Sequence, residues 1–251
     1  MTTATAPLLV AMQPTFLPWL GYFALMAEAD IFVFLDDVQF SKQSWQSRNR
    51  VAGPNGEVLL SLPIARKPSR PLIRDTKIAD PGFADDMMAR IKGSLGKAPH
   101  WPLVQDLLDR GFRRAPEGLA ALNIALVEDI AALFGFAPEI LRSSQLDLGP
   151  LDRASRLPAI CRAKGAARYL SPQGSTQYLA EDRPFDGTGI TPLFQNFTHP
   201  VYEQGSGAFL SHMSAIDALA WLGPVATGAA IRAGIGPQLG ENEKDDPKHA
   251  D

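Results

Sequence analysis

The sequence predicts an α/β fold in which helices cover both faces of a mostly parallel sheet, with a separate β-hairpin near residues 50–62. Two short apolar runs, 8–12 and 31–35, are typical of strands buried on both faces. Residues 21–29 between them have a helical apolar face, so the three segments indicate a strand–helix–strand unit. Asn55-Gly56 lies between two further extended runs and predicts the turn of the hairpin.

The rest of the chain alternates helical and extended patterns. Apolar residues recur at helical spacing from Leu119 to Leu133, the clearest stripe in the chain. Because residues beyond 235 are dominated by Gly, Pro and charge, we expect one domain over 1–235 and a disordered polar tail over 236–251. Further strands are expected at 139–146, 168–171 and 190–197, and further helices around 83–95, 101–108, 154–161, 213–222 and 225–235.

Composition excludes several classes of protein. The 251 residues carry a net charge of −3, so no overall basic field would draw the chain to nucleic acid. The single cysteine, Cys161, excludes an internal disulfide framework and favours a reducing compartment. No apolar run approaches the ~18 residues of a membrane span, and the N-terminus lacks a charged signal-peptide start. We therefore expect a cytoplasmic protein without a membrane span.

The first candidate site follows the first strand. Gln13-Pro14-Thr15 lies at its carboxyl end, and two prolines and a glycine fix a tight path into the next helix. Ligands of α/β sheets bind outside the carboxyl ends of parallel strands, so Gln13, Thr15 and Tyr22 are candidate substrate-binding residues. The alternative interpretation is a rigid turn that packs aromatic side chains into the core.

The second candidate site follows the second strand. Paired carboxylates at Asp36 and Asp37 suit a divalent cation or a substrate ammonium group. Arg48 and Arg50 alternate along an extended chain, so both point to one face and suit capture of a phosphate or carboxylate. Alternatively, the acidic and basic groups pair with each other. The same polar segment contains three more candidate substrate-binding residues, Lys42, Trp45 and Asn49.

Two later segments add weaker candidates. Ser171, Gln173 and Ser175 follow an expected strand, although Ser175 equally suits the N-cap of a short helix. His199 is held by the proline after it and is followed by Tyr202, so it is a candidate general base. A lone histidine is more often structural. Standard nucleotide, zinc-protease and hydrolase motifs are missing from the sequence, and Cys161 is expected to be a core residue.

These segments resemble the WbqC-like protein family over nearly the whole chain except its termini. The N-terminal block carries the resemblance most specifically, with Gln13 to Phe23, then Asp36-Asp37-Val38-Gln39-Phe40, Trp45 and Arg48-Asn49-Arg50. It continues through Leu62-Pro63, Ser143-Ser144, Tyr169-Leu170-Ser171, Tyr178-Leu179, His199-Pro200-Val201-Tyr202 and Ser214-Ala215-Ile216-Asp217. The chain departs from the family pattern at Pro172 and in the last helix at Ala215, Ala218, Ala220 and Trp221.

The resemblance implies a role in making surface polysaccharides or specialised metabolites, where a glycine-transferase activity has been suggested for the family. A fainter likeness to nucleotidyltransferases such as pantothenate synthetase comes from Thr15-Phe16-Leu17-Pro18 and Gly21. Both histidines of that superfamily are absent, and Tyr22 stands in place of the second. The sheet is accordingly expected to be Rossmann-like or nucleotidyltransferase-like.

The leading interpretation is an acyl- or aminoacyl-transferase that forms an amide on an amino sugar or a related metabolite. Lys42, Arg48 and Arg50 would hold an anion, Asp36 or Asp37 the amine or a metal, and His199 would accept the proton. The alternatives are an ATP-dependent ligase that forms an acyl-adenylate, and a non-catalytic protein that binds a nucleotide sugar or acts as a scaffold. The sequence leaves the cofactor open, with ATP or a nucleotide sugar with magnesium as the candidates, and nucleic acid enters only if an aminoacyl-tRNA is the donor.

Overall fold

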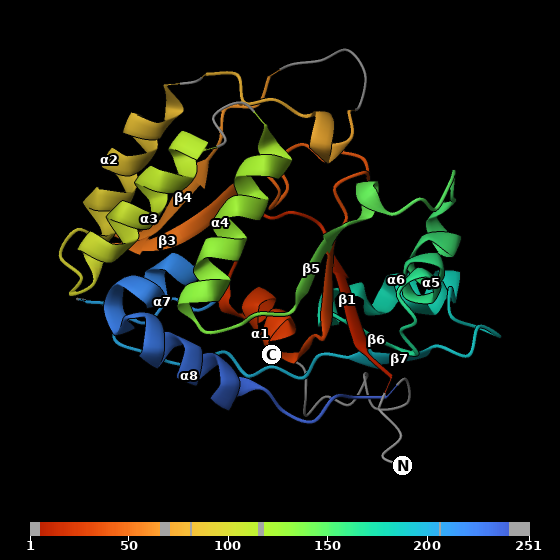
Figure 1. The fold of residues 1–251 in the computed structure, drawn as a ribbon. Helices are drawn as coiled ribbons and strands as arrows, with labels where there is room; N and C mark the ends of the chain where they lie inside the picture. Colours follow the sequence, from red (N-terminus) through yellow and green to blue (C-terminus); the bar gives the residue numbers. More distant parts are fainter. Residues whose placement is uncertain (1–5, 66–70, 81, 115–117, 206, 241–251) are drawn as a thin grey trace.

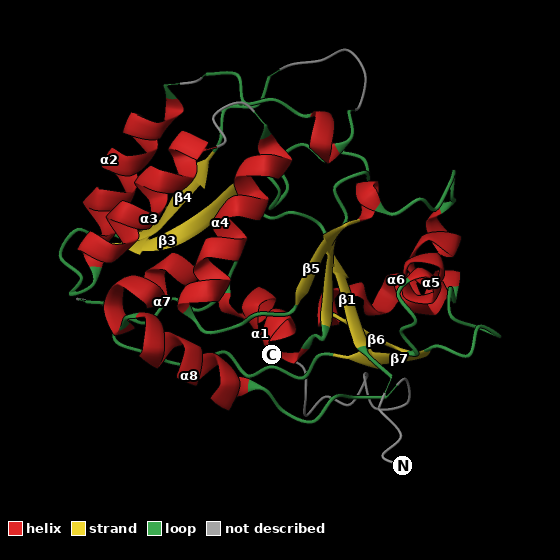
Figure 2. Ribbon diagram, in the orientation of Figure 1, coloured by secondary structure: helices red, strands yellow, loops and turns green. Residues whose placement is uncertain are grey.

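A five-stranded parallel sheet forms the centre of the protein (Figures 1 and 2). The computed structural model describes residues 6–65, 71–80, 82–114, 118–205 and 207–240. The strands have the spatial order β5-β2-β1-β6-β7, which is 3-2-1-4-5 along the chain and matches the first five strands of a doubly wound sheet. Their bounds are β1 Leu8–Met12, β2 Ile31–Phe34, β5 Glu139–Arg142, β6 Arg168–Ser171 and β7 Thr191–Phe194.

Alternation along the central strands divides the core between the two faces of the sheet. Leu8 and Val10 of β1 belong to one buried cluster, and Leu9 and Ala11 to a second. The first cluster is covered by α1 (Leu20–Glu28) and by helices α2, α3, α4, α7 and α8, and the second by α5 and α6 on the opposite face (Figure 1). The predicted α/β class with helices on both faces is confirmed. The other helices are α2 Phe83–Leu95, α3 Trp101–Arg114, α4 Leu119–Leu133, α5 Arg153–Ala163, α6 Thr176–Asp182, α7 Ala215–Leu222 and α8 Pro224–Gly234.

The predicted hairpin is present as β3 (Arg48–Gly53) and β4 (Gly56–Ser61), away from the main sheet. Gly56 has φ +113°, a conformation that glycine adopts without strain, which explains why the turn ends there. The edge of β3 that faces away from β4 is covered by the start of α7. Ser214 N–H donates to the Arg50 carbonyl at 2.7 Å, and the Asp217 carboxylate accepts from Ala52 N–H at 2.7 Å.

Two strands are shorter than the sequence predicts, because the polar residues that follow them make hydrogen bonds outside the sheet. β5 ends at Arg142, where residues 143–145 form the short helix η2 (Ser143–Gln145) that turns toward Asp36. β7 ends at Phe194, after which the Gln195 side chain donates to the Gly21 carbonyl of α1. Apolar run length therefore overestimates strands whose last residues are engaged in side-chain hydrogen bonds.

The described chain remains packed beyond residue 235. Phe194 and Leu239 exchange two backbone hydrogen bonds of 2.8 and 3.0 Å, and Leu239 is 6% exposed. The packed part thus reaches four residues past the expected boundary, and the rest of the expected tail, 241–251, lies outside the described residues. No helix within the described ranges is long and apolar enough to cross a membrane.

Candidate functional site

The carboxyl edge of the sheet contains the topological switch point, where β2 and β6 lie on opposite sides of β1. In doubly wound sheets a crevice forms there, because the chain leaves the central strands in opposite directions. Gln13 follows β1 and is exposed, Thr15 is half-buried, and Ser171 at the end of β6 is buried. These three predicted site residues therefore share one edge of the sheet.

The turn from β1 into α1 is held by its own polar groups. The Gln13 carbonyl accepts the Tyr22 hydroxyl at 3.1 Å and the Thr15 hydroxyl at 3.2 Å. Burial raises the pKa of Tyr22 well above its usual value, so its hydroxyl remains a donor. Leu17 is fully buried with φ 45°, a strained conformation for a branched side chain. Tyr22 and Thr15 accordingly shape the turn, which leaves the Gln13 side chain at the surface.

A chain of amide groups joins this turn to the loop before β3. Gln46 donates from Nε2 to the Gln13 side-chain oxygen at 2.6 Å, and its own oxygen accepts Ser41 N–H at 2.9 Å. Beneath them, Asn123 of α4 donates from Nδ2 to the carbonyls of Pro14 at 3.0 Å and Gln46 at 2.7 Å. Asn123 is fully buried and fixes the two loops relative to each other. Neither Gln46 nor Asn123 was predicted, because their role depends on partners distant in the sequence.

Trp19 covers the first turn of α1. A Cβ on Gly21 would lie 2.2 to 2.6 Å from three atoms of the Trp19 ring, so only glycine permits this approach. The indole also lies parallel to the His199 ring, with centroids 6.0 Å apart and an interplanar angle of 6°. The His212 ring is 4.8 Å from the same indole, and His212 has φ 58°. Non-glycine residues with strained backbones occur often at functional sites, so the conformation of His212 supports a functional role for this aromatic cluster.

Asp36 and Asp37 are hydrogen-bonded to the end of β5 and to α5. Asp36 is 2% exposed and accepts from Ser144 N–H at 3.0 Å and from the Ser144 hydroxyl at 2.7 Å. Asp37 accepts the Ser143 hydroxyl and pairs with Arg156 at 2.8 Å. Burial raises the pKa of Asp37, but the hydrogen bonds from Ser143 and Arg156 outweigh it and leave the pKa below its usual value. Both carboxylates thus take these partners from outside their own segment, and the pairing with Arg48 or Arg50 that the alternative interpretation expected is not what holds them.

Among the described residues, no group of three or more histidine, cysteine, aspartate or glutamate side chains is placed to hold a metal ion. Cys161 is buried in α5, and burial raises its pKa to about 12, so it is a thiol at neutral pH. This agrees with the prediction that it is a core residue.

Arg48 and Arg50 lie on one face of the hairpin, and Trp45, in the loop before it, lies against Arg50. Trp45 is 50% exposed, and the Arg50 guanidinium stacks over its ring with 5.2 Å from Cζ to the centroid. Arg50 also pairs through Nη1 with Glu57 of β4 at 2.7 Å. Arg48 precedes Arg50 on the same face, and Lys42 is exposed in the preceding loop. Asn49 is instead buried and donates to the Phe16 carbonyl at 3.1 Å, which gives it a structural role.

Tyr202 lies in a buried polar network rather than at the surface. Its hydroxyl donates to the Asp217 carboxylate at 3.2 Å, and Gln204 donates to the same oxygen at 3.3 Å. Burial of this carboxyl group is only partly offset by these bonds, so the pKa of Asp217 is raised to about 6. Burial raises the pKa of Tyr202 even more strongly. Tyr202 therefore holds the start of α7 against the segment that carries His199.

His199 is half-buried and in its neutral form. Its Nδ1 lies 2.9 Å from the Pro200 carbonyl, which requires a proton on Nδ1, and its Nε2 accepts His212 N–H at 3.3 Å. Burial lowers its pKa below the usual value. Nε2 is thus the nitrogen with a lone pair, and it is held only by a long hydrogen bond. Such a nitrogen can accept a proton from a substrate.

The predicted residues form two neighbouring groups. Gln13, Thr15 and the aspartates line the carboxyl edge. In the second group, the His199 and His212 rings lie beside the Trp19 indole, and Ser214 links the backbone of Trp19 to that of Arg50, whose guanidinium stacks on Trp45. Trp45 connects the groups, since its carbonyl accepts Phe16 N–H at 3.0 Å and Gln46 follows it. The second group, Trp19, Trp45, Arg50, His199, His212 and Ser214, is called the Trp19 cluster below.

Two predicted residues stand apart from both groups. Ser175 is at the N-cap of α6, as the alternative interpretation expected, but its side chain makes no capping hydrogen bond. Gln173 lies in a short helix before α6, and its side chain is outside the described part of the structure. Their assignment to substrate binding stays a prediction.

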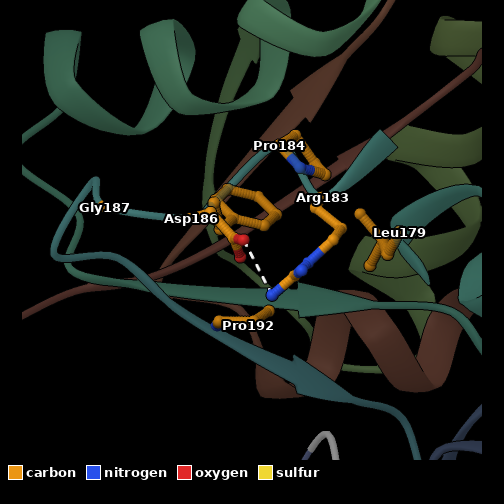
Figure 3. Close-up of a pocket in the computed structure, with 7 residues that line it drawn as sticks. Leu179, Arg183, Pro184, Asp186, Gly187 and Pro192 are labelled. Atoms are coloured by element: carbon orange, nitrogen blue, oxygen red, sulfur yellow. Dashed lines mark ion pairs between the residues drawn. The ribbon is translucent and has the colours of Figure 1, made fainter. Parts of the chain in front are cut away.

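A hollow of about 230 Å³ lies elsewhere, between the end of α6 and the start of β7 (Figure 3). It is lined by Arg183 and Asp186, which pair at 2.8 Å, and by Pro192. Since Pro192 is near the first residue of β7, this hollow is at the amino edge of the sheet, the edge opposite the switch point. None of the predicted site residues lines it.

Comparison with known proteins agrees with the resemblance drawn from the N-terminal block. The WbqC-like protein family matches residues 13–228, which include both groups of site residues. The chain belongs to the WbqC-like protein family. It is also similar to the uncharacterized protein Rv1507c of Mycobacterium tuberculosis, at 27% identity over 211 residues that cover 83% of this chain and 90% of that protein. No solved structure matches the chain significantly.

Proposed function

We propose that this protein is an acyl- or aminoacyl-transferase that forms an amide bond on an amino sugar or a related amine. The observation that carries the proposal is the arrangement of the Trp19 cluster, which combines a neutral histidine with an arginine beside an exposed tryptophan. Amide formation needs both groups. The histidine would accept a proton from the attacking amine, and the arginine would supply a positive charge for the activated acyl donor.

The reaction can be assigned to named groups. The amine attacks the acyl carbon, the bond to the donor's leaving group breaks, and the amine loses one proton. His199 Nε2 would take this proton, because the lowered pKa keeps the imidazole neutral near pH 7. Arg50 would bind the anionic part of the donor, since two of its contacts already fix the guanidinium. Cys161 has no role, because a buried thiol with a pKa of about 12 is a poor nucleophile.

The test uses purified protein, amino-sugar acceptors and glycyl donors of several kinds, including thioesters and aminoacyl-tRNA, with amide formation followed by mass spectrometry. His199→Gln should lower turnover roughly 10²-fold with little change in acceptor binding. His100→Gln, at an exposed position, is the matched control. Because the pKa of His199 is lowered, the wild-type rate should be flat above about pH 6.5 and fall only in more acidic buffer. Unchanged turnover in His199→Gln would remove the base from the mechanism.

A second candidate function is a non-catalytic binding protein for a nucleotide sugar. One observation favours it, namely that Asp36 and Asp37, the carboxylates expected to hold the amine or a metal, are already occupied by hydrogen bonds and an ion pair. Binding of a nucleotide sugar without turnover of any donor would support this candidate. The third possibility, an ATP-dependent ligase, predicts release of AMP and pyrophosphate when ATP, a carboxylic acid and an amine are supplied with magnesium.

A further inference from the structure

Two buried polar atoms of the Trp19 cluster lack partners. Within the described residues, Arg50 Nε and Ser214 Oγ are inaccessible to solvent and make no hydrogen bond. Ser214 is fully buried as a whole residue. More than about 90% of buried polar groups in proteins are hydrogen-bonded, because an unpaired one costs the free energy of its lost hydration. Two such atoms on adjoining residues therefore indicate a binding partner.

The two residues are neighbours in space although 164 positions separate them in the sequence. Ser214 N–H donates to the Arg50 carbonyl at 2.7 Å, so β3 and the start of α7 lie side by side at this point. Ser214 is the N-cap residue of α7, yet its side chain makes no capping hydrogen bond. The usual explanation for serine at this position therefore does not apply.

The charges around the pair favour an anion. Glu57 takes Nη1 of Arg50 and the Trp45 ring stacks on the guanidinium, so Nε is a donor of this group that still has no acceptor. Arg48 adds a second positive charge on the same face, and the N-terminus of α7 adds a partial one. Two carboxylates oppose an anion here. Glu57 is paired with Arg50, and Asp217 in the first turn of α7 is occupied by Ala52 N–H, Tyr202 and Gln204.

We propose that Arg50 Nε and Ser214 Oγ form a subsite for an anionic oxygen, belonging to a carboxylate or a phosphate of the substrate. Nε donates one hydrogen bond to this oxygen and the Ser214 hydroxyl donates another. The inference deepens the proposed transferase function, because it states where the anionic group of the donor is held. The subsite adds Ser214, which is distant in the sequence, to the anion site predicted for Arg48 and Arg50.

The subsite is tested with inorganic phosphate and with acetate as separate probes, so that the two sources of the anionic oxygen are distinguished. Addition of the preferred anion at about ten times its Kd should raise the Tm of the wild-type protein by about 3–5 °C. Ser214→Ala and Arg50→Lys should each bind that anion at least tenfold more weakly by isothermal titration. Arg50→Lys keeps a positive charge opposite Glu57, while it removes the Nε donor together with the rest of the guanidinium.

Matched controls come from residues with similar local surroundings. Arg232→Lys changes another arginine that stacks on an aromatic ring, 4.7 Å from the Phe136 centroid, and should bind the anion like the wild type. Ser94→Ala removes a half-buried serine hydroxyl on α2, which donates to the Arg90 carbonyl at 3.3 Å, and should likewise bind the anion like the wild type. Without anion, Ser214→Ala should melt at or slightly above the wild-type temperature, because it removes a hydroxyl that has no partner.

Three results would overturn the proposal. The first is the absence of any Tm shift with phosphate or acetate up to about 50 mM, where even weak sites begin to fill. The second is anion binding of wild-type strength in both variants. The third is a clear loss of Tm in Ser214→Ala without anion, which would mean that an ordered water already satisfies the hydroxyl. These measurements need no turnover, so they can fail independently of the transferase assay.

Discussion

Asp217 offers a quantitative test of the network that joins α7 to the hairpin. Its pKa is raised to about 6, against 3.8 for an ordinary aspartate, because the carboxyl group is buried. A difference of about two pKa units corresponds to about 3 kcal/mol of free energy. Asp217→Asn replaces the titrating group with a neutral one of the same size, and its amide oxygen can still accept Ala52 N–H.

The sign of the effect follows from proton binding. Between about pH 4 and pH 6 the folded protein binds more protons at Asp217 than the unfolded chain, so its contribution to stability falls as the pH rises and is constant above. In the Asp217→Asn variant residue 217 does not titrate, so its contribution to stability does not fall as the pH rises. The difference in free energy of unfolding between variant and wild type should therefore shift by about 2–2.5 kcal/mol in favour of the variant from pH 4 to pH 7, since the unfolded aspartate is already mostly ionised at pH 4.

The Asp217→Asn substitution should also lower the free energy of unfolding by an amount that does not depend on pH. The asparagine amino group faces the donors of Tyr202 and Gln204, and a mismatched buried hydrogen bond costs about 1–3 kcal/mol at every pH. Urea denaturation followed by circular dichroism at pH 4, 5, 6 and 7 measures both terms. Asp85→Asn, at an exposed carboxylate on α2, controls for removal of one negative charge. A difference that does not change with pH would refute the reasoning.

Two further substitutions test the packing of the site. Gly21→Ala places a Cβ within 2.2–2.6 Å of the Trp19 ring, so we expect a loss of about 1–3 kcal/mol and a red shift of tryptophan emission, and unchanged emission and stability would contradict this packing. Asn123→Ala leaves two buried carbonyls without their donor, which should cost about 1–3 kcal/mol for each, as measured by urea denaturation. Full stability in this variant would show that the two loops are held by other contacts.

Local patterns in the sequence predict much of the fold. The apolar runs of β1 and β2 predict buried parallel strands because both faces of these strands must be covered, and all of their residues except Met12 are buried. The hairpin is predicted by its turn, and α4 by a stripe that recurs at helical spacing. These features depend on residues a few positions apart, which the sequence displays directly.

The site is predicted only in part. Gln13 and Arg50 are found from their position after a strand and from their alternation, both of which are local. The partners that define their roles are distant, since Asn123 fixes the loop of Gln13 from α4 and Ser214 adjoins Arg50 from the start of α7. Asp36 illustrates the same limit, because its environment is set by Ser144, 108 positions away.

The sequence by itself determined which segments become strands and helices and which faces are buried, because periodicity and turn residues act over a few positions. Only the tertiary structure decided that β1 lies at the centre of the sheet and that α7 covers the free edge of β3. It also decided that the His199 ring lies beside Trp19 and that Ser214 links the backbones of Trp19 and Arg50. The physical reason is that burial and hydrogen bonding can be satisfied by many distant partners, and a single pattern does not say which of them the folded chain selects.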